Sequence, residues 1–299
     1  MTERTDTAIV IAIVVAVAAG AGMAWAGSSS GDRVGPVPLF ALCGGLAFAI
    51  NWLFFIPAAL AQSERYYDLV GGLTYITVIV VAVFLARPLD LRAALVAAMV
   101  IFWSLRLAGF LFLRIARSGH DSRFDEIKTR PLRFFMAWTV QGLWVLLTAA
   151  AALAVITGGV REPLGLSGIT GILLWCIGMV IETVADLQKS RFKQNADNEG
   201  KFIRDGLWAW SRHPNYFGEI VLWTGMAIVA IPVLRDWQWA TLISPFFVTF
   251  LLTKVSGIPL LEKKADQRWG GQDDYEEYKR RTPVLIPRFP GQGFAAGAK

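Results

Sequence analysis

The stretch SRHPNYFGEIVLWTGMAIVAIPV, residues 211–233, joins a polar, aromatic segment directly to an apolar run. Residues 211–219 carry arginine, histidine, asparagine, tyrosine and glutamate side chains, whereas Ile220–Val233 is almost entirely apolar. Pro214 suits the first turn of a helix, because the amide hydrogen that proline lacks has no helical partner there. The pattern predicts a membrane helix that begins at a ligand-binding segment. The alternative is an ordinary helix start with an interfacial tyrosine.

The composition around this stretch is that of an integral membrane protein. Of 299 residues, 55% are hydrophobic and 17% are charged, which is too apolar for a soluble chain of this length. A helix needs ~20 residues to cross hydrocarbon. We predict an all-α, polytopic membrane helix bundle from eight apolar stretches of about that length: residues 8–26, 39–61, 67–86, 91–113, 134–157, 166–187, 217–233 and 239–261.

Basic residues predict the orientation of these helices, because lysine and arginine accumulate in cytoplasmic loops. In the eight-helix arrangement, 22 of the 29 basic residues fall in the N-terminus, residues 62–66, 114–133 and 188–216, and the C-terminal tail. We therefore expect both termini in the cytoplasm. The net charge of +6 then reflects membrane orientation and an anionic ligand, and does not predict nucleic-acid binding.

The first apolar stretch allows a second interpretation, since Ala24-Trp25-Ala26 before Gly27 is similar to a signal-peptide cleavage site. Against it, the apolar run is long for a signal peptide and Glu3 and Asp6 precede it. The predicted division is an N-terminal helix and loop (1–38), a membrane domain (39–290) and a flexible tail (291–299). Cys43 and Cys176 fall in predicted membrane helices and give no metal or disulfide signal.

Two polar stripes flank residues 188–216. Glu182 and Asp186 are one helical turn apart, and Lys189 and Lys193 continue that face. Asn215, Glu219 and Trp223 share a face of the following helix in the same way. Carboxylates there can bind ribose or amide groups, while cations bind phosphates; the cations of this region are Lys193, Lys201, Arg204 and Arg212. The alternative is a solvated charged loop.

Ionisable residues inside predicted spans are also candidates, because a charge in hydrocarbon is costly unless it faces a cavity. Arg106 and Lys254 are the two basic examples, although Arg106 can instead be a structural residue that pairs with a carboxylate or extends to the interface. Asp68, at the start of the third apolar stretch, is the nearest acidic candidate on the cytoplasmic side.

The segments DLQKSRFKQN, GLWAWSRHPNYFGEIVLW and YKRRTPVLIP resemble the bacterial branch of the steroid 5-alpha-reductase C-terminal family. The resemblance implies the inner (plasma) membrane of a bacterium and seven core membrane helices, with the first helix here as an addition. It also implies hydride transfer from NADPH to the beta carbon of an enone. It places cofactor binding on Asp186, Lys193, Lys201, Asn215, Glu219 and Trp223, with Arg106 and Lys254 at the in-membrane basic positions. It places the carbonyl-polarising carboxylate on Asp68 and its assisting tyrosine on Trp103, whose indole is only a weak donor.

Arg212-His213-Pro214 supports a rival, because the isoprenylcysteine carboxyl and phospholipid methyltransferases carry a similar motif and bind S-adenosylmethionine. That cofactor has no phosphate, so Lys189 and Arg204 beside Lys193 and Lys201 favour NADPH. The methyltransferase tail carries a Glu-Glu pair where this chain has Glu262-Lys263. A third possibility is a lipid-binding or scaffolding protein without catalysis.

The hypothesis is thus an NADPH-dependent membrane oxidoreductase that acts on a steroid-like or other lipophilic substrate among membrane lipids. Asp68 and Trp103 are the predicted catalytic residues. The predicted cofactor-binding residues are Arg106, Asp186, Lys189, Lys193, Lys201, Arg204, Arg212, His213, Asn215, Tyr216, Glu219, Trp223, Lys254 and Glu262.

Overall fold

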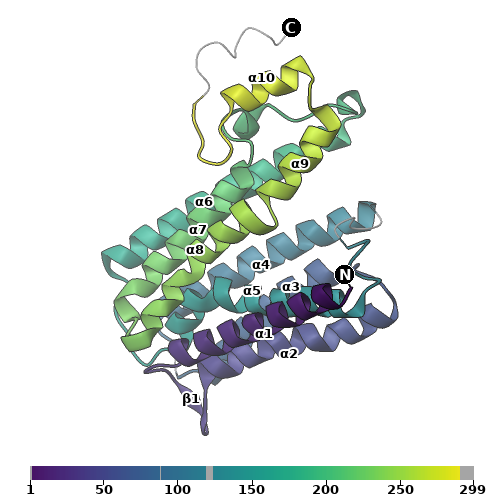
Figure 1. Ribbon diagram of the computed structural model, residues 1–299. Coiled ribbons are helices and arrows are strands. Elements are labelled where there is room, and N and C mark those ends of the chain that lie inside the picture. Colours follow the sequence, from purple (N-terminus) through teal and green to yellow (C-terminus); the bar gives the residue numbers. More distant parts are fainter. Residues whose placement is uncertain (1, 88, 119–123, 290–299) are drawn as a thin grey trace. The chain divides into compact units, whose positions relative to one another are not determined.

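The computed structural model describes residues 2–87, 89–118 and 124–289, without the side chains of residues 2–5 and 112–118 (Figure 1). Within this part of the chain, eight helical segments are long and apolar enough to cross a membrane, which confirms the predicted all-α, polytopic membrane fold. The chain forms two compact units, residues 1–169 with 226–244, and residues 170–225 with 245–299. The predicted division at residues 38 and 290 stays a prediction.

The first unit is built from five long helices and a small hairpin. α1 (Thr2–Gly27) is followed by β1 (Arg33–Val34) and β2 (Val37–Pro38), which pair antiparallel. Then come α2 (Leu39–Leu60), α3 (Tyr67–Leu85), α4 (Leu91–Ser118) and α5 (Pro131–Thr157). The 3-10 turns η3 (Ile231–Val233) and η4 (Asp236–Leu242) complete it. The hairpin has no counterpart among the sequence predictions.

α5 is the core helix of the first unit. It packs against each of the other four helices, and Figure 1 shows α1 and α2 beside it. Ala149–Ile156 is buried on every side, as expected of a helix that is apolar all round. Small residues allow close packing: a Cβ on Gly142 would lie 3.1 Å from the Cα of Phe48.

Buried charges hold one end of this unit together. Arg92 is 1% exposed and donates to the carbonyl oxygens of Glu162, Leu164 and Val229 at 3.4, 3.1 and 2.6 Å. Asp32, 5% exposed, pairs with Arg87 at 3.2 Å and with Arg161 at 3.7 Å. Because both side chains gain partners that replace water, these charges can remain buried.

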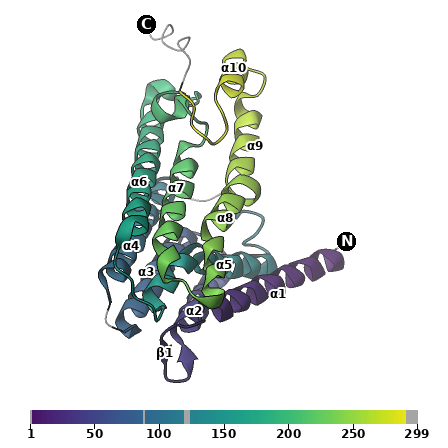
Figure 2. The same ribbon diagram turned by 90° about the vertical axis from the view of Figure 1, so that its left-hand side faces the viewer.

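The second unit is a helical pair with a cap of short elements. α6 (Gly165–Gln194) and α7 (Pro214–Ala230) lie side by side, as Figures 1 and 2 both show. Between them run the 3-10 turns η1 (Ala196–Asn198) and η2 (Gly206–Ala209). The chain continues through α8 (Ile243–Phe250), η5 (Leu251–Val255), α9 (Ile258–Trp269) and α10 (Asp273–Arg281).

The eighth predicted helix, residues 239–261, is not continuous, which corrects the sequence prediction. A 3-10 turn precedes α8, and the π-helical turn η5 follows it before Gly257 and Pro259 start α9. Pro259 lacks the amide that would continue the helical hydrogen bonds, so the helix restarts there. α6 also continues to Gln194, beyond its predicted end at 187, whereas α7 begins at Pro214 as its proline suggested.

Candidate functional site

Glycines bring α6 and α7 into direct backbone contact. A Cβ on Gly178 would lie 2.5 Å from the carbonyl oxygen of Gly218, and one on Gly225 would lie 2.5 Å from the carbonyl oxygen of Gly171. Such close approach is possible only with small residues at the crossing. We call this contact the seam. It fixes the register of the two helices, so residues on either flank of the seam on α6 meet those on α7.

The two polar stripes predicted from sequence meet on one flank of the seam. The Nδ2 of Asn215 donates to Oδ1 of Asp186 at 3.2 Å. Asp186, Glu182 and Glu219 are 7%, 3% and 9% exposed, and Trp223 is fully buried. Three acidic side chains and an amide therefore share a protected flank of one helical pair, as the four-residue spacings indicated.

The residues before α7 form a second polar group around one carboxylate. Glu262 of α9 accepts from Arg212 at 2.7 Å and lies 2.7 Å from Nε2 of His213. The His213 ring stacks on Tyr216 with a ring-centroid separation of 5.6 Å and an interplanar angle of 8°. Ser211 caps the start of α7 through a 3.1 Å bond from the His213 amide. Together, these contacts hold Arg212, His213 and Tyr216 in fixed positions.

Several buried atoms at this helix start have no hydrogen-bond partner among the described residues. They are Nε of Arg212, Nδ1 of His213 and Oδ1 of Asn215. Burial lowers the pKa of His213, and Lys189 and Arg212 act in the same direction, while the bond to Glu262 opposes them. In the neutral imidazole Nε2–H donates to Glu262, which leaves Nδ1 as an acceptor. The group thus presents one donor and two acceptors to a polar ligand.

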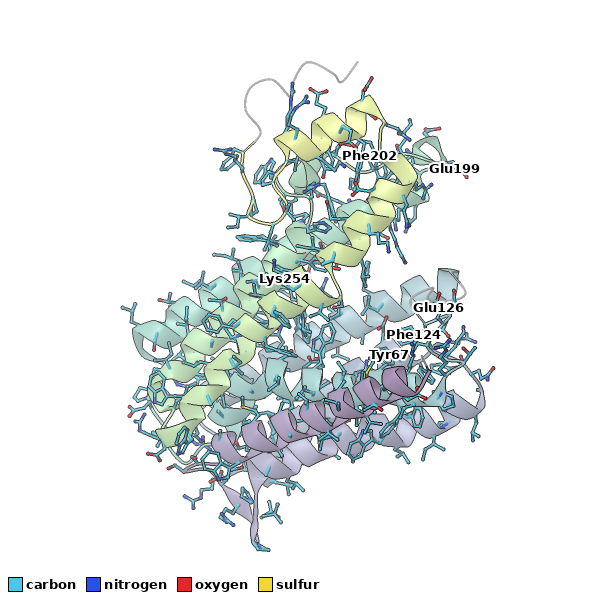
Figure 3. All side chains as sticks on the ribbon, in the orientation of Figure 1. Tyr67, Phe124, Glu126, Glu199, Phe202 and Lys254 are labelled. Carbon is cyan, nitrogen blue, oxygen red and sulfur yellow. The ribbon has the colours of Figure 1, made fainter. Side chains whose placement is uncertain are left out.

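Candidate cations lie on the last turns of α6 and along the loop that follows it. Lys189 sits over the Trp208 ring at 4.3 Å, a cation–π contact. Lys193 and Lys201 are exposed, and Arg204 pairs with Asp274 of α10 at 3.8 Å. Phe202, labelled in Figure 3, packs on an aromatic cluster that anchors the loop to α9 and α10: Trp269, Tyr275 and Tyr278.

Lys254 lies on the π-helical turn between α8 and α9 (Figure 3), and its side chain is exposed. The sequence suggested instead a cation that faces a protein-lined or wet cavity. A π-turn often marks a functional position, but the exposure alone assigns no ligand. The role of Lys254 stays a prediction.

The remaining candidates belong to the first unit. Asp68 is half-buried in the first turn of α3. Trp103 of α4 is 2% exposed and packs edge-to-face on Tyr75, with a ring-centroid separation of 5.2 Å. Arg106, one helical turn after Trp103, is half-buried. Tyr67, which precedes Asp68 in the sequence, packs against Phe124 with a ring-centroid separation of 4.7 Å. Both residues are labelled in Figure 3, and their contact holds the start of α3.

Sequence reasoning did not anticipate how the C-terminal segment supports this group. The amide of Arg212 donates to the carbonyl of Pro283 at 2.9 Å, and Ser211 Oγ donates to that of Leu285 at 2.8 Å. The hydroxyl of Tyr278 donates to the carbonyl of Trp208 at 2.8 Å. The only available signal was the YKRRTPVLIP segment of the resemblance, which carries no information on these long-range contacts.

Fold and site together define an integral membrane protein that carries a polar helix-pair site. The model of the family described as "Protein of unknown function (DUF1295)" matches residues 54–282, and the chain belongs to this family. DUF1295 is itself part of the steroid 5-alpha-reductase family. This confirms the family resemblance seen in the sequence.

Curated relatives cover only part of the chain. The 3-oxo-5-alpha-steroid 4-dehydrogenase 1 of Rattus norvegicus is 29% identical over 119 residues, 40% of each chain. The steroid 5-alpha-reductase DET2 of Gossypium hirsutum is 29% identical over 119 residues, 40% of this chain and 41% of its own. The probable O-methyltransferase ustE of Ustilaginoidea virens is 34% identical over 61 residues, 20% of this chain and 22% of its own. No solved structure matches.

Proposed function

We propose that the protein is an NADPH-dependent membrane reductase that reduces the carbon–carbon double bond of a lipophilic enone. The observation that carries the proposal is the set of buried polar atoms on Arg212, His213 and Asn215 that have no hydrogen-bond partner within the described part of the chain. They lie next to the Asp186–Asn215 bond. Unpartnered buried polar atoms are costly, so a polar ligand that satisfies them is favoured. The relatives named as steroid 5-alpha-reductases support the reaction class.

The residues on this flank of the seam and along the loop after α6 have the chemistry to bind the polar groups and phosphates of NADPH. Asp186, Asn215 and Glu219 can bind amide and hydroxyl groups, and the start of α7 favours an anionic group through its helix dipole. The cations Lys189, Lys193, Lys201 and Arg204 can neutralise phosphates, which are absent from S-adenosylmethionine. When bound, NADPH would supply a hydride for the beta carbon of the enone. From the family resemblance, Asp68 would donate a proton to the carbonyl oxygen of the substrate, and Trp103 takes the position of the assisting tyrosine.

One observation favours a second candidate, an S-adenosylmethionine-dependent membrane methyltransferase acting on a lipid or prenylated substrate. Arg212 and His213 of the Arg-His-Pro motif both bind Glu262, and one relative is named a probable O-methyltransferase. The carboxylate that binds them would suit a cationic sulfonium. S-adenosylmethionine has no phosphate for the cations along residues 189–204 to bind, which is why we place this candidate second.

Binding titrations on detergent-purified protein separate the two candidates. We expect the parent to bind NADPH and to bind NADH more weakly. Lys193→Ala should weaken NADPH by about ten- to hundredfold and NADH less, because a charged hydrogen bond to the 2′-phosphate contributes about 1.5–3 kcal/mol. Arg191→Ala is the matched control, since Arg191 is exposed on another face of α6. Binding of S-adenosylmethionine without NADPH would reject the reductase.

A further inference from the structure

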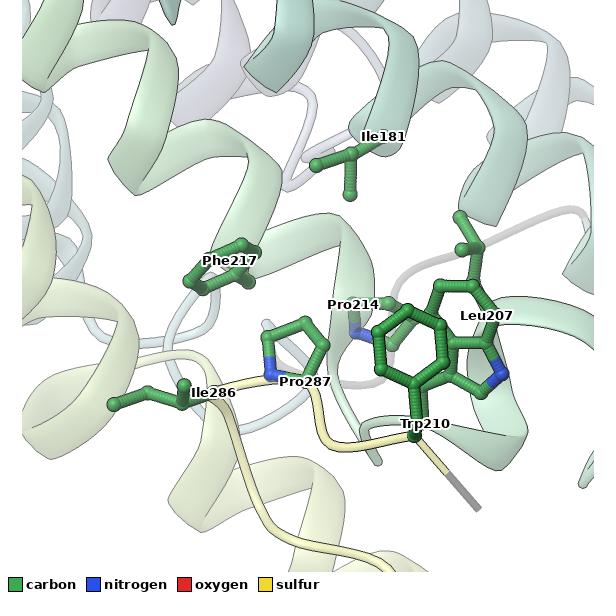
Figure 4. Close-up of a pocket in the computed structure, with 8 residues that line it drawn as sticks. Ile181, Leu207, Trp210, Pro214, Phe217, Ile286 and Pro287 are labelled. Atoms are coloured by element: carbon green, nitrogen blue, oxygen red, sulfur yellow. The ribbon is translucent and has the colours of Figure 1, made fainter.

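A pocket lies on the other flank of the seam from the polar stripes. Successive residues of a helix point about 100° apart, so Ile181 and Glu182 flank the Gly178 contact on opposite sides. Phe217 and Glu219 flank Gly218 in the same way. The pocket has a volume of about 310 Å³ (Figure 4). Its lining is apolar apart from an indole nitrogen: Ile181, Leu207, Trp210, Pro214, Phe217, Ile286, Pro287 and Phe289.

The walls of this side pocket are held in place by hydrogen bonds. The amide of Arg288 donates to the carbonyl of Trp210 at 2.9 Å, and Ser211 Oγ binds the Leu285 carbonyl at 2.8 Å. Trp210 also contacts the Phe289 ring at 4.7 Å. The segment of residues 283–289 therefore forms a fixed wall opposite α6 and α7. The volume lies at the lower end of the ~300–1,000 Å³ range of small-ligand sites.

Ile181 of the side pocket lies on a helix with exposed apolar residues. Ile177, Val180 and Val184, on the same helix as Ile181, are 52%, 61% and 37% exposed, and this helix is a membrane span. At the other rim, Ile286 and Phe289 are 71% and 78% exposed. The neighbours of such a face in a bilayer are acyl chains, so a chain can enter the pocket without crossing water.

A basic residue is adjacent in the sequence to residues that line the pocket. Arg288 lies between Pro287 and Phe289, both of which line the pocket, and its side chain is exposed. Trp210 is an amphipathic residue of the kind that sits at the level of lipid head groups. A cation beside an apolar pocket at this level suits a phosphate above an acyl chain, and anionic lipids attract basic residues by about 1 kcal/mol each.

We propose that the side pocket binds one acyl chain of an anionic phospholipid from the surrounding bilayer, with its phosphate at Arg288. This site is separate from the proposed cofactor site, because it uses the opposite flank of the seam. The bound lipid would brace the 283–289 segment, whose Pro283 and Leu285 carbonyls hold Arg212 and Ser211.

Native mass spectrometry of the full chain in detergent tests the site, with phosphatidylglycerol and phosphatidylcholine of the same acyl chains as probes. We expect the parent to retain one phosphatidylglycerol tightly. Ile181→Trp and Leu207→Trp, which fill the pocket from two walls, should each weaken retention by at least about tenfold, the cost of exposing roughly two methylene groups. Arg288→Gln should lower the preference for phosphatidylglycerol by about fivefold.

Ile177→Trp is the matched control, since it adds the same ring to the exposed face of α6 outside the pocket. Equal loss in Ile177→Trp and Ile181→Trp, or no tightly held lipid in the parent, would overturn the proposal. Competition by cholest-4-en-3-one would also overturn it and make the pocket a substrate site. If size-exclusion chromatography shows that Ile181→Trp does not fold, the lipid retention of Leu207→Trp tests the proposal instead.

Discussion

His213 experiences opposing influences on its charge at the start of α7. Burial and the cations Lys189 and Arg212 lower its pKa, while Glu262 raises it, and burial dominates. The folded protein therefore binds the proton at lower pH than the unfolded chain, in which the pKa of histidine is about 6.5. The stabilising contribution of the neutral ring is complete above that value and is lost as pH falls through the lower folded pKa.

We expect acidification from pH 8 to pH 5 to lower the melting temperature of the parent more than that of His213→Gln. The glutamine keeps a donor for Glu262 but does not titrate. Melting curves of both proteins in the same detergent, at several pH values, measure this difference. A parent that becomes more stable than the variant below pH 6.5 would show that the Glu262 pair outweighs burial.

Asp68 tests the catalytic half of the proposal. Asp68→Asn keeps a hydrogen-bond donor but cannot release a proton, so turnover of an enone should fall by about 10²- to 10⁴-fold. Its NADPH affinity should remain nearly unchanged. Asn215→Ala should show the opposite pattern, losing cofactor first. A turnover assay and a binding titration on both variants distinguish these roles. If Asp68→Asn lost as much NADPH affinity as Asn215→Ala, Asp68 would be a cofactor-binding residue and not the acid that contacts the substrate.

At the level of residues, short-range patterns were predictable and long-range pairs were not. The four-residue spacing of Glu182 and Asp186, and of Asn215 and Glu219, indicated shared helix faces, and the structure brings Asp186 and Asn215 together. The contacts of Glu262 with Arg212 and His213 join residues about fifty positions apart. Such pairs depend on how α7 and α9 pack, which helical periodicity does not encode.

At the level of elements, the seam between α6 and α7 determines the site. Gly218→Ala should lower the free energy of unfolding by about 1–3 kcal/mol, the usual range for overpacking a tight contact. Its Cβ would lie 2.6 Å from the Glu182 amide nitrogen and 2.7 Å from the Gly178 carbonyl oxygen, and backbone atoms cannot rotate away. NADPH affinity should fall as well, because the helices that carry Asp186 and Asn215 must separate. Thermal melting and a titration measure the two effects.

Gly45→Ala is the control for that change. Gly45 is a glycine of α2 with no atom within 4 Å of its added Cβ. Alanine there should leave stability unchanged or raise it by up to ~1 kcal/mol, because it restricts the unfolded chain and favours the helix. If both substitutions had the same effect, close backbone contact at the seam would not explain the first.

The membrane spans were predictable, because the length of an apolar stretch determines them. The break in the last span and the hairpin were not, because they depend on backbone conformation. All eight spans were evident from hydropathy. The break in the last span arises from the π-turn at Leu251–Val255 and the restart of the helix after Gly257. Because the residues on either side of the break are apolar, hydropathy does not reveal it. The β1–β2 hairpin is only two residues per strand, below the length at which an alternating pattern becomes visible.

At the level of the whole molecule, the orientation in the membrane decides whether the proposed site can use a cytosolic cofactor. The basic residues predict that residues 188–216 are cytoplasmic and that residues 158–164 are outside. Exposed glutamates offer a matched pair of probes, Glu199 after η1 and Glu162 before α6. Two glycines in segments predicted to lie on opposite sides are poorer positions for a probe. A Cβ on Gly159, in the outer segment, would lie 2.6 Å from the Ser30 carbonyl oxygen, and Gly119, in the cytoplasmic segment 114–133, lies outside the described residues.

We therefore expect Glu199→Cys to react with a membrane-impermeant maleimide only in inverted vesicles, and Glu162→Cys only in intact spheroplasts. Both are made in a Cys43→Ala, Cys176→Ala background, which removes the only two native thiols. The physical basis is that basic segments remain on the cytoplasmic side during insertion. Labelling of the two positions from the same side would reject the predicted crossing of α6 between them. Reversed labelling would place Arg212, His213 and Asn215 away from cytosolic NADPH, and the reductase proposal would fail with it.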